Sequence, residues 1–168
     1  MSATASRRER DIILMAIDKE KASFARLAAA ARACASPKAR RLYNQLALDE
    51  LRHLLTLVSL MDGLADDCLD QLDLTFPPGN PPEPLPQSEE EILRSTMAEE
   101  MRSRELFARL AVCGGREEIL SLLDMLRAEE EDHLARLRSM LYGLEADRPV
   151  VAKWFRSIRR LVPTAYLH

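Results

Sequence analysis

The sequence of 168 residues is long enough to bury a substantial core as one domain, without disulfides or a structural metal. Its five glycines, its low aromatic content of 5% and its abundant Ala, Leu, Glu and Arg are typical of an all-α protein. The formal net charge of −3 does not favour nucleic acid as a partner, and three separated cysteines without a Cys-x-x-Cys pair argue against a disulfide framework or a cysteine metal site.

We expect a soluble, cytoplasmic protein with reduced thiols. The arginines near the start precede only a short apolar run, which Asp18, Lys19 and Glu20 interrupt, so this segment does not have the form of a secretory signal. No stretch approaches the roughly 20 uninterrupted apolar residues that a membrane-spanning helix needs.

The first predicted helix runs from about Arg8 to Cys34. Its apolar residues recur at steps of four and three, which places them on one face: Ile13, Ile17, Phe24, Leu27 and Ala31. Glu20 lies on the same line. Because burial of an unpaired carboxylate is costly, Glu20 taken alone is better explained as a helix-edge residue that reaches solvent.

Ser36 and Pro37 are typical of an N-cap and a first helical residue, so a second helix begins after a short turn and packs antiparallel to the first. Glu50 and His53 interrupt its apolar line, whose other members are Ala39, Leu42, Leu46, Leu57 and Leu60. A single histidine on such a face is more often a hydrogen-bonded core residue than a metal ligand.

The segment from Leu74 to Gln87 is rich in proline and cannot be helical. A flexible linker between two small domains is one interpretation, but two antiparallel helices alone leave one apolar side bare. Extended at about 3.1 Å per residue, the segment reaches roughly 40 Å, the length of a helix of about 27 residues. We therefore predict a crossover, residues 73–87, that carries the chain along a bundle.

A second hairpin is predicted after this segment. Ser88 and Glu91 form a capping box at the start of a third helix, and Gly114 and Gly115 end that helix. Arg104 stands where the first helix has Phe24, and the other inward positions are Leu93, Met97, Glu100, Phe107 and Ala111. The fourth helix has one inward line as well, namely Ile119, Leu122, Leu126, Glu130, His133, Leu137 and Met140.

After Pro149 the sequence predicts a short basic amphipathic helix over residues 150–162. We expect residues 1–146 to form the bundle and residues 147–168 to form this helix and a tail. Docking of the helix on the bundle or on a second subunit is favoured over contact with an anionic membrane surface.

The second predicted hairpin repeats the pattern of the first. Adding 80 to the residue number of each polar core position in the first hairpin gives the matching position in the second. The six candidate metal ligands are Glu20, Glu50, His53, Glu100, Glu130 and His133. In each copy a glutamate precedes a histidine by three residues, so both lie on one helix face and can bind one ion together. Di-metal sites in the cores of four-helix bundles have a known pattern: two helices supply one Glu each, and the other two supply a Glu-x-x-His motif each. Four carboxylates with one imidazole per ion suit iron or manganese better than copper or structural zinc.

At these residues the sequence resembles the rubrerythrin-like branch of the ferritin-like superfamily, over about Ile12 to Leu141. The segments that carry the resemblance are AIDKE at 16–20, Ser36-Pro37, Leu42-Tyr43 and LALDELRH at 46–53. The resemblance implies a ferritin-like four-helix bundle of two antiparallel hairpins joined by a long crossover. It further implies a bridging and catalytic pair, Glu50 and Glu130, terminal carboxylates at Glu20 and Glu100, and one metal each for His53 and His133.

The family resemblance implies a site for two iron ions, with manganese or zinc as substitutes, that activates peroxide or dioxygen as a rubrerythrin-like peroxidase or ferrous iron oxidase. The alternative is a non-catalytic iron-binding or storage protein, or a helical interaction module. Rubrerythrins usually have a further carboxylate at the position of Ser103, and often a tyrosine at those of Leu27 and Phe107. No Cys-x-x-Cys domain follows, so a peroxidase would use a separate electron-donor protein. We expect a homodimer, although a cage remains an alternative.

Asp49 and Glu129 directly precede the two bridging candidates. A ligating imidazole normally donates its other N–H to an acceptor that fixes its orientation. In related di-iron bundles a residue at this position reaches the histidine of the opposite copy. We therefore predict that Asp49 contacts His133 and that Glu129 contacts His53.

Overall fold

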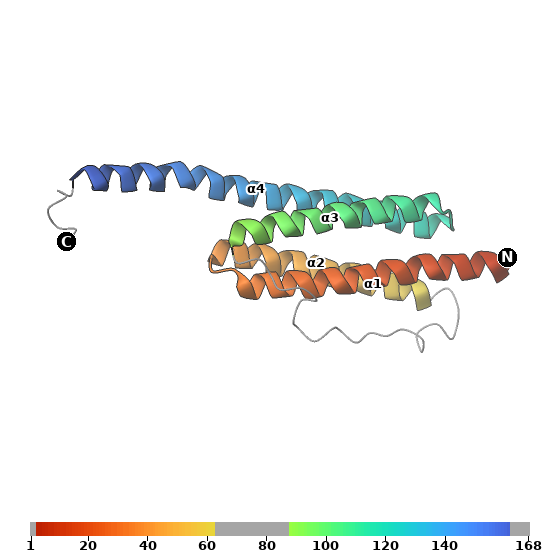
Figure 1. The fold of residues 1–168 in the computed structure, drawn as a ribbon. Helices are drawn as coiled ribbons and strands as arrows, with labels where there is room; N and C mark the ends of the chain where they lie inside the picture. Colours follow the sequence, from red (N-terminus) through yellow and green to blue (C-terminus); the bar gives the residue numbers. More distant parts are fainter. Residues whose placement is uncertain (1–2, 63–87, 162–168) are drawn as a thin grey trace.

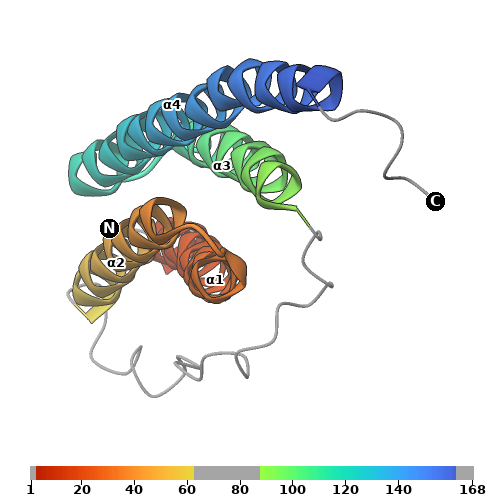
Figure 2. The same ribbon diagram turned by 90° about the vertical axis from the view of Figure 1, so that its left-hand side faces the viewer.

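The computed structural model describes residues 3–62 and 88–161, with side chains described for 7–62 and 88–144. The described chain forms four helices: α1 (Ala3–Ala33), α2 (Pro37–Asp62), α3 (Glu89–Val112) and α4 (Glu117–Leu161). α1 packs on α2 and α3 packs on α4, which gives two antiparallel hairpins (Figure 1). Seen along the bundle, the two hairpins lie one above the other (Figure 2). The predicted four-helix bundle of two hairpins is therefore confirmed, while the predicted crossover at 73–87 lies outside the described residues.

The predicted signals at the helix ends are present in the structure. At the start of α3 the Glu91 backbone N–H donates to Ser88 Oγ at 3.2 Å, and the Ser88 N–H donates to Glu91 Oε2 at 3.2 Å, which completes the capping box. α2 begins at Pro37, directly after Ser36. α3 ends at Val112, and Gly114 follows with a φ of 78°, a left-handed conformation that glycine adopts without steric cost.

The prediction of a separate C-terminal helix after Pro149 is wrong. α4 is one helix from Glu117 to Leu161. Residues 150–161 of the predicted helix are its C-terminal part, which extends beyond the other three helices (Figure 1). Proline lacks a backbone N–H, so it removes one hydrogen bond from a helix. α4 already has many turns before Pro149, and adding residues to an existing helix avoids the cost of forming a first turn. None of the helices described is long and apolar enough to cross a membrane.

The hydrophobic core consists of two clusters, one toward each end of the bundle. The cluster nearer the start of α1 has as its largest members Ile13, Ile17, Leu57, Met61, Phe107, Ile119, Leu123 and Leu126. The cluster at the other end includes Leu27, Leu42, Tyr43, Leu46, Leu93, Leu137 and Met140. Along every helix the candidate metal ligands lie between members of these two clusters, so they occupy the middle of the bundle.

Two carboxylates connect the hairpins at the ends of the bundle. Glu9 of α1 accepts a hydrogen bond from the Arg116 backbone N–H at 2.9 Å, directly before α4. Glu89 of α3 accepts one from the Ser36 N–H at 2.5 Å, directly before α2. Adding 80 to 9 and 36 gives 89 and 116, so the two contacts are equivalent in the repeat. Each hairpin thus satisfies a free backbone donor at a helix start of the other.

We expect Glu9→Ala to lower the free energy of unfolding by about 1–3 kcal/mol, because it removes a buried charged acceptor from the start of α4. Glu9 also pairs with the Arg116 guanidinium, at 3.2 Å between Oε2 and Nε. Urea denaturation measures the change. The control is Asp11→Ala, which alters an exposed acid on the same helix and should change stability by less than about 0.5 kcal/mol. Equal effects of the two substitutions would contradict the capping role.

Candidate metal centre

All six candidate metal ligands are buried, each with at most 2% of its surface exposed. One glutamate comes from α1 and one from α3, and a glutamate with a histidine comes from each of α2 and α4. The spacing of three residues between glutamate and histidine directs both side chains to the same side of their helix. The structure therefore brings together every residue that the repeat predicted for the site.

The six side chains form two overlapping groups. Glu20, Glu50 and His53 form one, and Glu50, Glu100, Glu130 and His133 form the other, with the ligand atoms of each group within 4.8 Å of one another. Glu50 belongs to both. Its Oε2 lies 3.5 Å from His53 Nδ1, and its Oε1 lies 3.2 Å from His133 Nδ1. The two oxygens of one carboxylate thus face the two histidines, whereas Glu130 belongs only to the second group.

The outward nitrogens of both histidines approach acids of the opposite hairpin. Glu129 Oε2 lies 2.7 Å from His53 Nε2, and Asp49 Oδ2 lies 3.6 Å from His133 Nε2. The two imidazole rings are nearly parallel, with centroids 6.0 Å apart and an interplanar angle of 18°. The predicted pairing across the hairpins is confirmed. The Nδ1 atoms are left facing the carboxylates, as a histidine needs for binding a metal through that nitrogen.

Two arginines contact the carboxylate of Asp49. Asp49 Oδ2 accepts a hydrogen bond from Arg136 at 2.9 Å, and Arg52 donates to Oδ1. These guanidinium groups outweigh the effect of burial and hold the pKa of Asp49 below its usual range. Sequence analysis missed both arginines, although Arg52 follows Asp49 by three residues and Arg136 follows His133 by three. The step of three from Asp49 to Arg52 within α2 was an available signal, whereas the contact of Arg136 with Asp49 joins two hairpins and has no such signal.

Burial and mutual repulsion perturb the carboxyl groups of the site. Burial, and then the neighbouring Glu50, raise the pKa of Glu20 well above its usual value. Burial and the nearby Glu100 likewise raise the pKa of Glu130. Burial alone would raise the pKa of Glu50 as well, but polar contacts with Glu20 and with both imidazoles outweigh it and lower that pKa. Of these three carboxyl groups, Glu50 is the one whose surroundings favour the charged form.

The two histidines hold their protons strongly when no cation is bound. Burial would lower the pKa of His53, but contacts with Glu20 and Glu50 outweigh it and raise the pKa to about 11. Contacts with Glu100 and Glu50 similarly raise the pKa of His133 to about 9. Protons thus balance the buried carboxylates, and a cation that binds here must displace them.

The residues present fit a pair of divalent cations. Among residues 7–62 and 88–144, most of the buried side-chain polar atoms without a hydrogen-bond partner belong to this cluster: both oxygens of Glu20, Glu50 and Glu130, with His53 Nδ1 and His133 Nε2. Buried polar groups without partners are costly, and metal coordination would satisfy the carboxylate oxygens. Four carboxylates and two imidazoles match the donor preference of iron or manganese.

Similarity to known proteins agrees with this donor set. The rubrerythrin family model matches residues 11–141, which include all six candidate ligands. The chain belongs to the rubrerythrin family. The match spans both hairpins and stops before the C-terminal part of α4.

Two solved structures resemble this rubrerythrin-family chain in fold. One is a two-domain protein from Anabaena variabilis with DJ-1/ThiJ/PfpI-like and ferritin-like domains, at 12% identity and a TM-score of 0.71, where the match covers 80% of this chain and 39% of that one. The other is a hypothetical protein from Pyrococcus furiosus, at 20% identity and a TM-score of 0.66, with 82% and 90% covered. No protein of curated function matches the sequence. The similarities establish a ferritin-like fold.

Ser103 is the main local difference from the usual rubrerythrin pattern. The residue is fully buried one turn after Glu100, and its hydroxyl donates to the Glu99 backbone carbonyl at 3.1 Å. Ser23, its equivalent in the first hairpin, is also buried. Leu27 and Phe107 are buried in the same way. The donor set therefore has the same composition in both halves of this rubrerythrin-family bundle.

We expect Glu129→Ala to weaken metal binding by about 10- to 100-fold, because loss of the acceptor at His53 Nε2 frees that imidazole to rotate and to change tautomer. Competition with a chromogenic chelator measures the affinity. Asp124→Ala is the matched control, since Asp124 is an exposed acid of the same helix. An unchanged affinity in Glu129→Ala, or an equal loss in the control, would show that this contact does not support the site.

Proposed function

We propose that the protein holds two iron ions in the middle of its bundle and activates peroxide or dioxygen there, as a rubrerythrin-like peroxidase or a ferrous iron oxidase. One observation carries the proposal: the two oxygens of Glu50 face one histidine from each hairpin, so that two groups of ligands share one carboxylate. A polar network that served only stability would pair its buried oxygens instead of leaving them without hydrogen bonds.

In this proposal each metal position has its own terminal ligands. Glu20 and His53 would bind one ion, Glu100, Glu130 and His133 would bind the other, and Glu50, which belongs to both groups, would be shared between them. The family resemblance adds Glu130 as a second shared carboxylate. A pair of ferrous ions would supply two electrons to peroxide or dioxygen. Manganese or zinc would occupy the same donors as substitutes.

The surrounding residues orient the ligands and exclude water. The apolar clusters on both sides keep bulk water from the middle of the bundle, which strengthens the interactions of charged groups there. Glu129 accepts a hydrogen bond from His53 Nε2, and Asp49, held by Arg136, approaches His133 Nε2. The hydrogen bond to Glu129 keeps the His53 imidazole with Nδ1 toward the carboxylates, and the Asp49 carboxylate faces the corresponding nitrogen of His133.

The proposal is tested by anaerobic titration with Fe(II), followed by addition of hydrogen peroxide or oxygenated buffer. We expect an absorbance change that saturates at two irons per chain and continued turnover with excess Fe(II), or with a reductant in the peroxide assay. Glu105→Ala, an exposed acid of α3, is a control that should behave as the wild type. Absence of iron binding would overturn the proposal.

Ser103 favours a second candidate function, non-catalytic iron binding or storage, because the additional carboxylate usual in rubrerythrins is absent at this position. The 168 residues also contain no Cys-x-x-Cys pair, so reducing electrons for a peroxidase would have to come from outside them. Tight binding of iron without turnover in the titration would support this second function.

A further inference from the structure

An open cavity lies at the seam between α2 and α4, toward the start of α2. It has a volume of about 340 Å³. Its polar lining consists of three cations, one amide and one hydroxyl, namely Lys38, Arg41, Arg136, Gln45 and Ser139. Two buried apolar residues, Leu42 and Met140, complete the lining. Within the described parts of the chain, this α2–α4 cavity thus has three positive charges and no carboxylate in its lining.

The spacing of these residues along each helix explains why they face the same seam. Lys38, Arg41 and Gln45 follow one another at steps of three and four, which places them on one face of α2. Arg136 and Ser139 are three apart and share a face of α4 in the same way. Adding or subtracting 80 gives the equivalent positions of the repeat, namely Glu118, Ser121, Met125, Thr56 and Ser59. Because these positions have no cation, the helical repeat itself does not require the three cations of the cavity.

The cations of the cavity have donors that the described part of the chain does not use. Lys38 and Arg41 are exposed, and among residues 7–62 and 88–144 neither side chain forms an ion pair or a hydrogen bond. Arg136 Nη2 donates to Asp49 Oδ2 at 2.9 Å. Asp132 Oδ2 lies 2.8 Å from Arg136 Nε, but it is not placed to accept a hydrogen bond from this buried nitrogen. A guanidinium has five N–H donors, so Arg136 keeps donors for a further acceptor.

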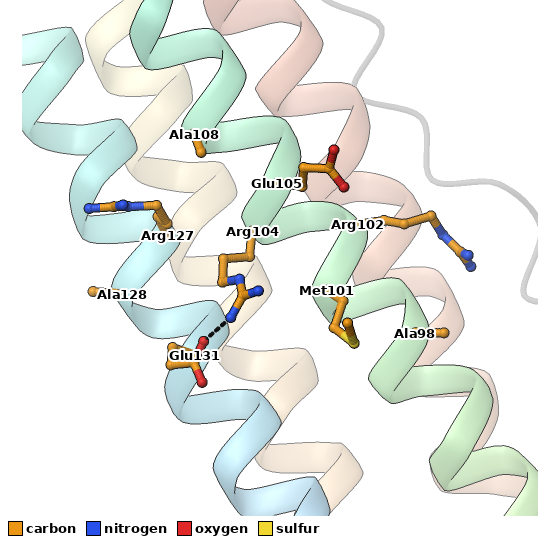
Figure 3. A pocket seen from close by; sticks show the side chains of 9 residues that line it. All are labelled: Ala98, Met101, Arg102, Arg104, Glu105, Ala108, Arg127, Ala128 and Glu131. Carbon is orange, nitrogen blue, oxygen red and sulfur yellow. Dashed lines mark hydrogen bonds and ion pairs between the residues drawn. The ribbon is translucent and has the colours of Figure 1, made fainter.

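The larger groove on the outer face of α3 and α4 differs from this cavity, because its charges are balanced within the chain. It has a volume of about 810 Å³ and contains three arginines, but two glutamates also line it (Figure 3). Arg104 pairs there with Glu131, and Arg127 pairs with Asp124 of its own helix at 3.1 Å. The third arginine is bonded to an acid one turn earlier on α3. An anion that entered this groove would have to compete with these carboxylates for the arginines.

We propose that the α2–α4 cavity binds a phosphate group, either inorganic phosphate or the phosphate of a small organic molecule. Phosphate offers several acceptor oxygens and up to two negative charges, which suits a cavity with three cations and two further donors. A carboxylate has only two oxygens and one charge. Lys38 also lies in the first turn of α2, where the helix dipole favours an anion. The proposal does not depend on a metal bound in the middle of the bundle.

Arg136 connects the cavity with the metal centre. The Asp49 carboxylate that it binds lies 3.6 Å from His133 Nε2. A phosphate in the cavity would therefore share one residue with the contacts that support a metal-binding histidine. For this reason Lys38 and Arg41 are the residues to vary, since no contact within the described residues joins their side chains to the metal centre.

Equilibrium dialysis of the full chain with radiolabelled inorganic phosphate, at about 0.15 M salt to screen non-specific attraction, tests the proposal. We expect saturable binding and a dissociation constant at least about tenfold higher in Lys38→Ala and in Arg41→Ala, because each substitution removes a charge-assisted hydrogen bond. Arg40→Ala is the matched control. Arg40 is an exposed cation of the same helix that lies outside the cavity and donates to the Cys34 carbonyl at 3.3 Å. Its substitution removes the same charge and should leave the constant unchanged.

Competition with phenyl phosphate distinguishes the two sources of the phosphate group. If phenyl phosphate displaces the label at a lower concentration than unlabelled phosphate does, the ligand is an organic phosphate whose apolar part contacts Leu42 and Met140. Displacement at an equal or higher concentration would indicate inorganic phosphate.

Three results would overturn the proposal. The first is the absence of saturable binding at millimolar phosphate. The second is an equal loss of affinity in Lys38→Ala, Arg41→Ala and Arg40→Ala, which indicates non-specific attraction. The third is binding that Lys38→Ala and Arg41→Ala leave unchanged; if Glu50→Ala removes it, the phosphate is bound to a metal ion instead. Circular dichroism checks that each variant is folded.

Discussion

Glu50→Ala is expected to reduce the metal content from two ions per chain to at most one weakly bound ion. The reason is that Glu50 is the only residue shared by the two groups of ligands found in the described part of the chain. Glu130→Ala should be milder, because Glu130 belongs to the second group alone and its loss leaves Glu20, Glu50 and His53 in place. Elemental analysis after removal of free metal gives the ratio.

Circular dichroism is the control for both variants, since removal of a buried carboxyl group relieves repulsion and should leave the helices intact. Two ions retained in Glu50→Ala would mean that another residue bridges the metals. A loss of metal that is equal in Glu50→Ala and Glu130→Ala would show that both carboxylates bridge, as the family resemblance implies.

Saturating Fe(II) or Mn(II) is expected to raise the melting temperature by about 5–10 °C over the chelator-treated protein. A ligand that binds only the native state at a hundredfold excess over its Kd contributes about 2.7 kcal/mol, and a domain of this size gains roughly 2–4 °C per kcal/mol. Thermal melts with chelator, Fe(II), Mn(II) and Mg(II) measure the effect, and Mg(II) should stabilise least because the site contains imidazoles.

The gain in melting temperature should be larger at pH 8 than at pH 6. The raised pKa values of His53, about 11, and His133, about 9, mean that the metal-free fold is stabilised by bound protons at low pH and loses this contribution as pH rises through these values. Metal binding must release the same protons, so its affinity increases with pH. If neither Fe(II) nor Mn(II) changes the melting temperature at either pH, the cluster is a hydrogen-bonded polar network without a metal.

The metal ligands could be predicted because their signal lies within each helix. The three-residue step from Glu50 to His53 places both on one face of their helix, however the two hairpins pack against each other. The same step at Glu130 and His133 makes a coincidence improbable. The contact of Glu129 with His53 was predictable as well, because a residue at this position in related di-iron bundles reaches the histidine of the opposite copy.

The features that the sequence did not predict depend on how the hairpins lie against each other. The inequality of Glu50 and Glu130 is one of them, since the repeat treats the two residues alike. The contacts of Glu9 with Arg116 and of Arg136 with Asp49 also join different hairpins, and no periodicity within a helix specifies such distances. The helix boundary predicted at Pro149 was wrong for a different reason. Proline is a strong signal for a helix end, but α4 continues through this residue.

The two hydrogen bonds from Arg116 to Glu9 and from Ser36 to Glu89 bear on the cooperativity of folding. They lie at opposite ends of the bundle, because α1 and α4 begin at one end and α2 and α3 begin at the other (Figure 1). Unfolding of either hairpin would therefore leave the first turn of a helix in the other without an acceptor. We therefore expect the duplicated hairpins to unfold together, with destabilisation of one half weakening the other.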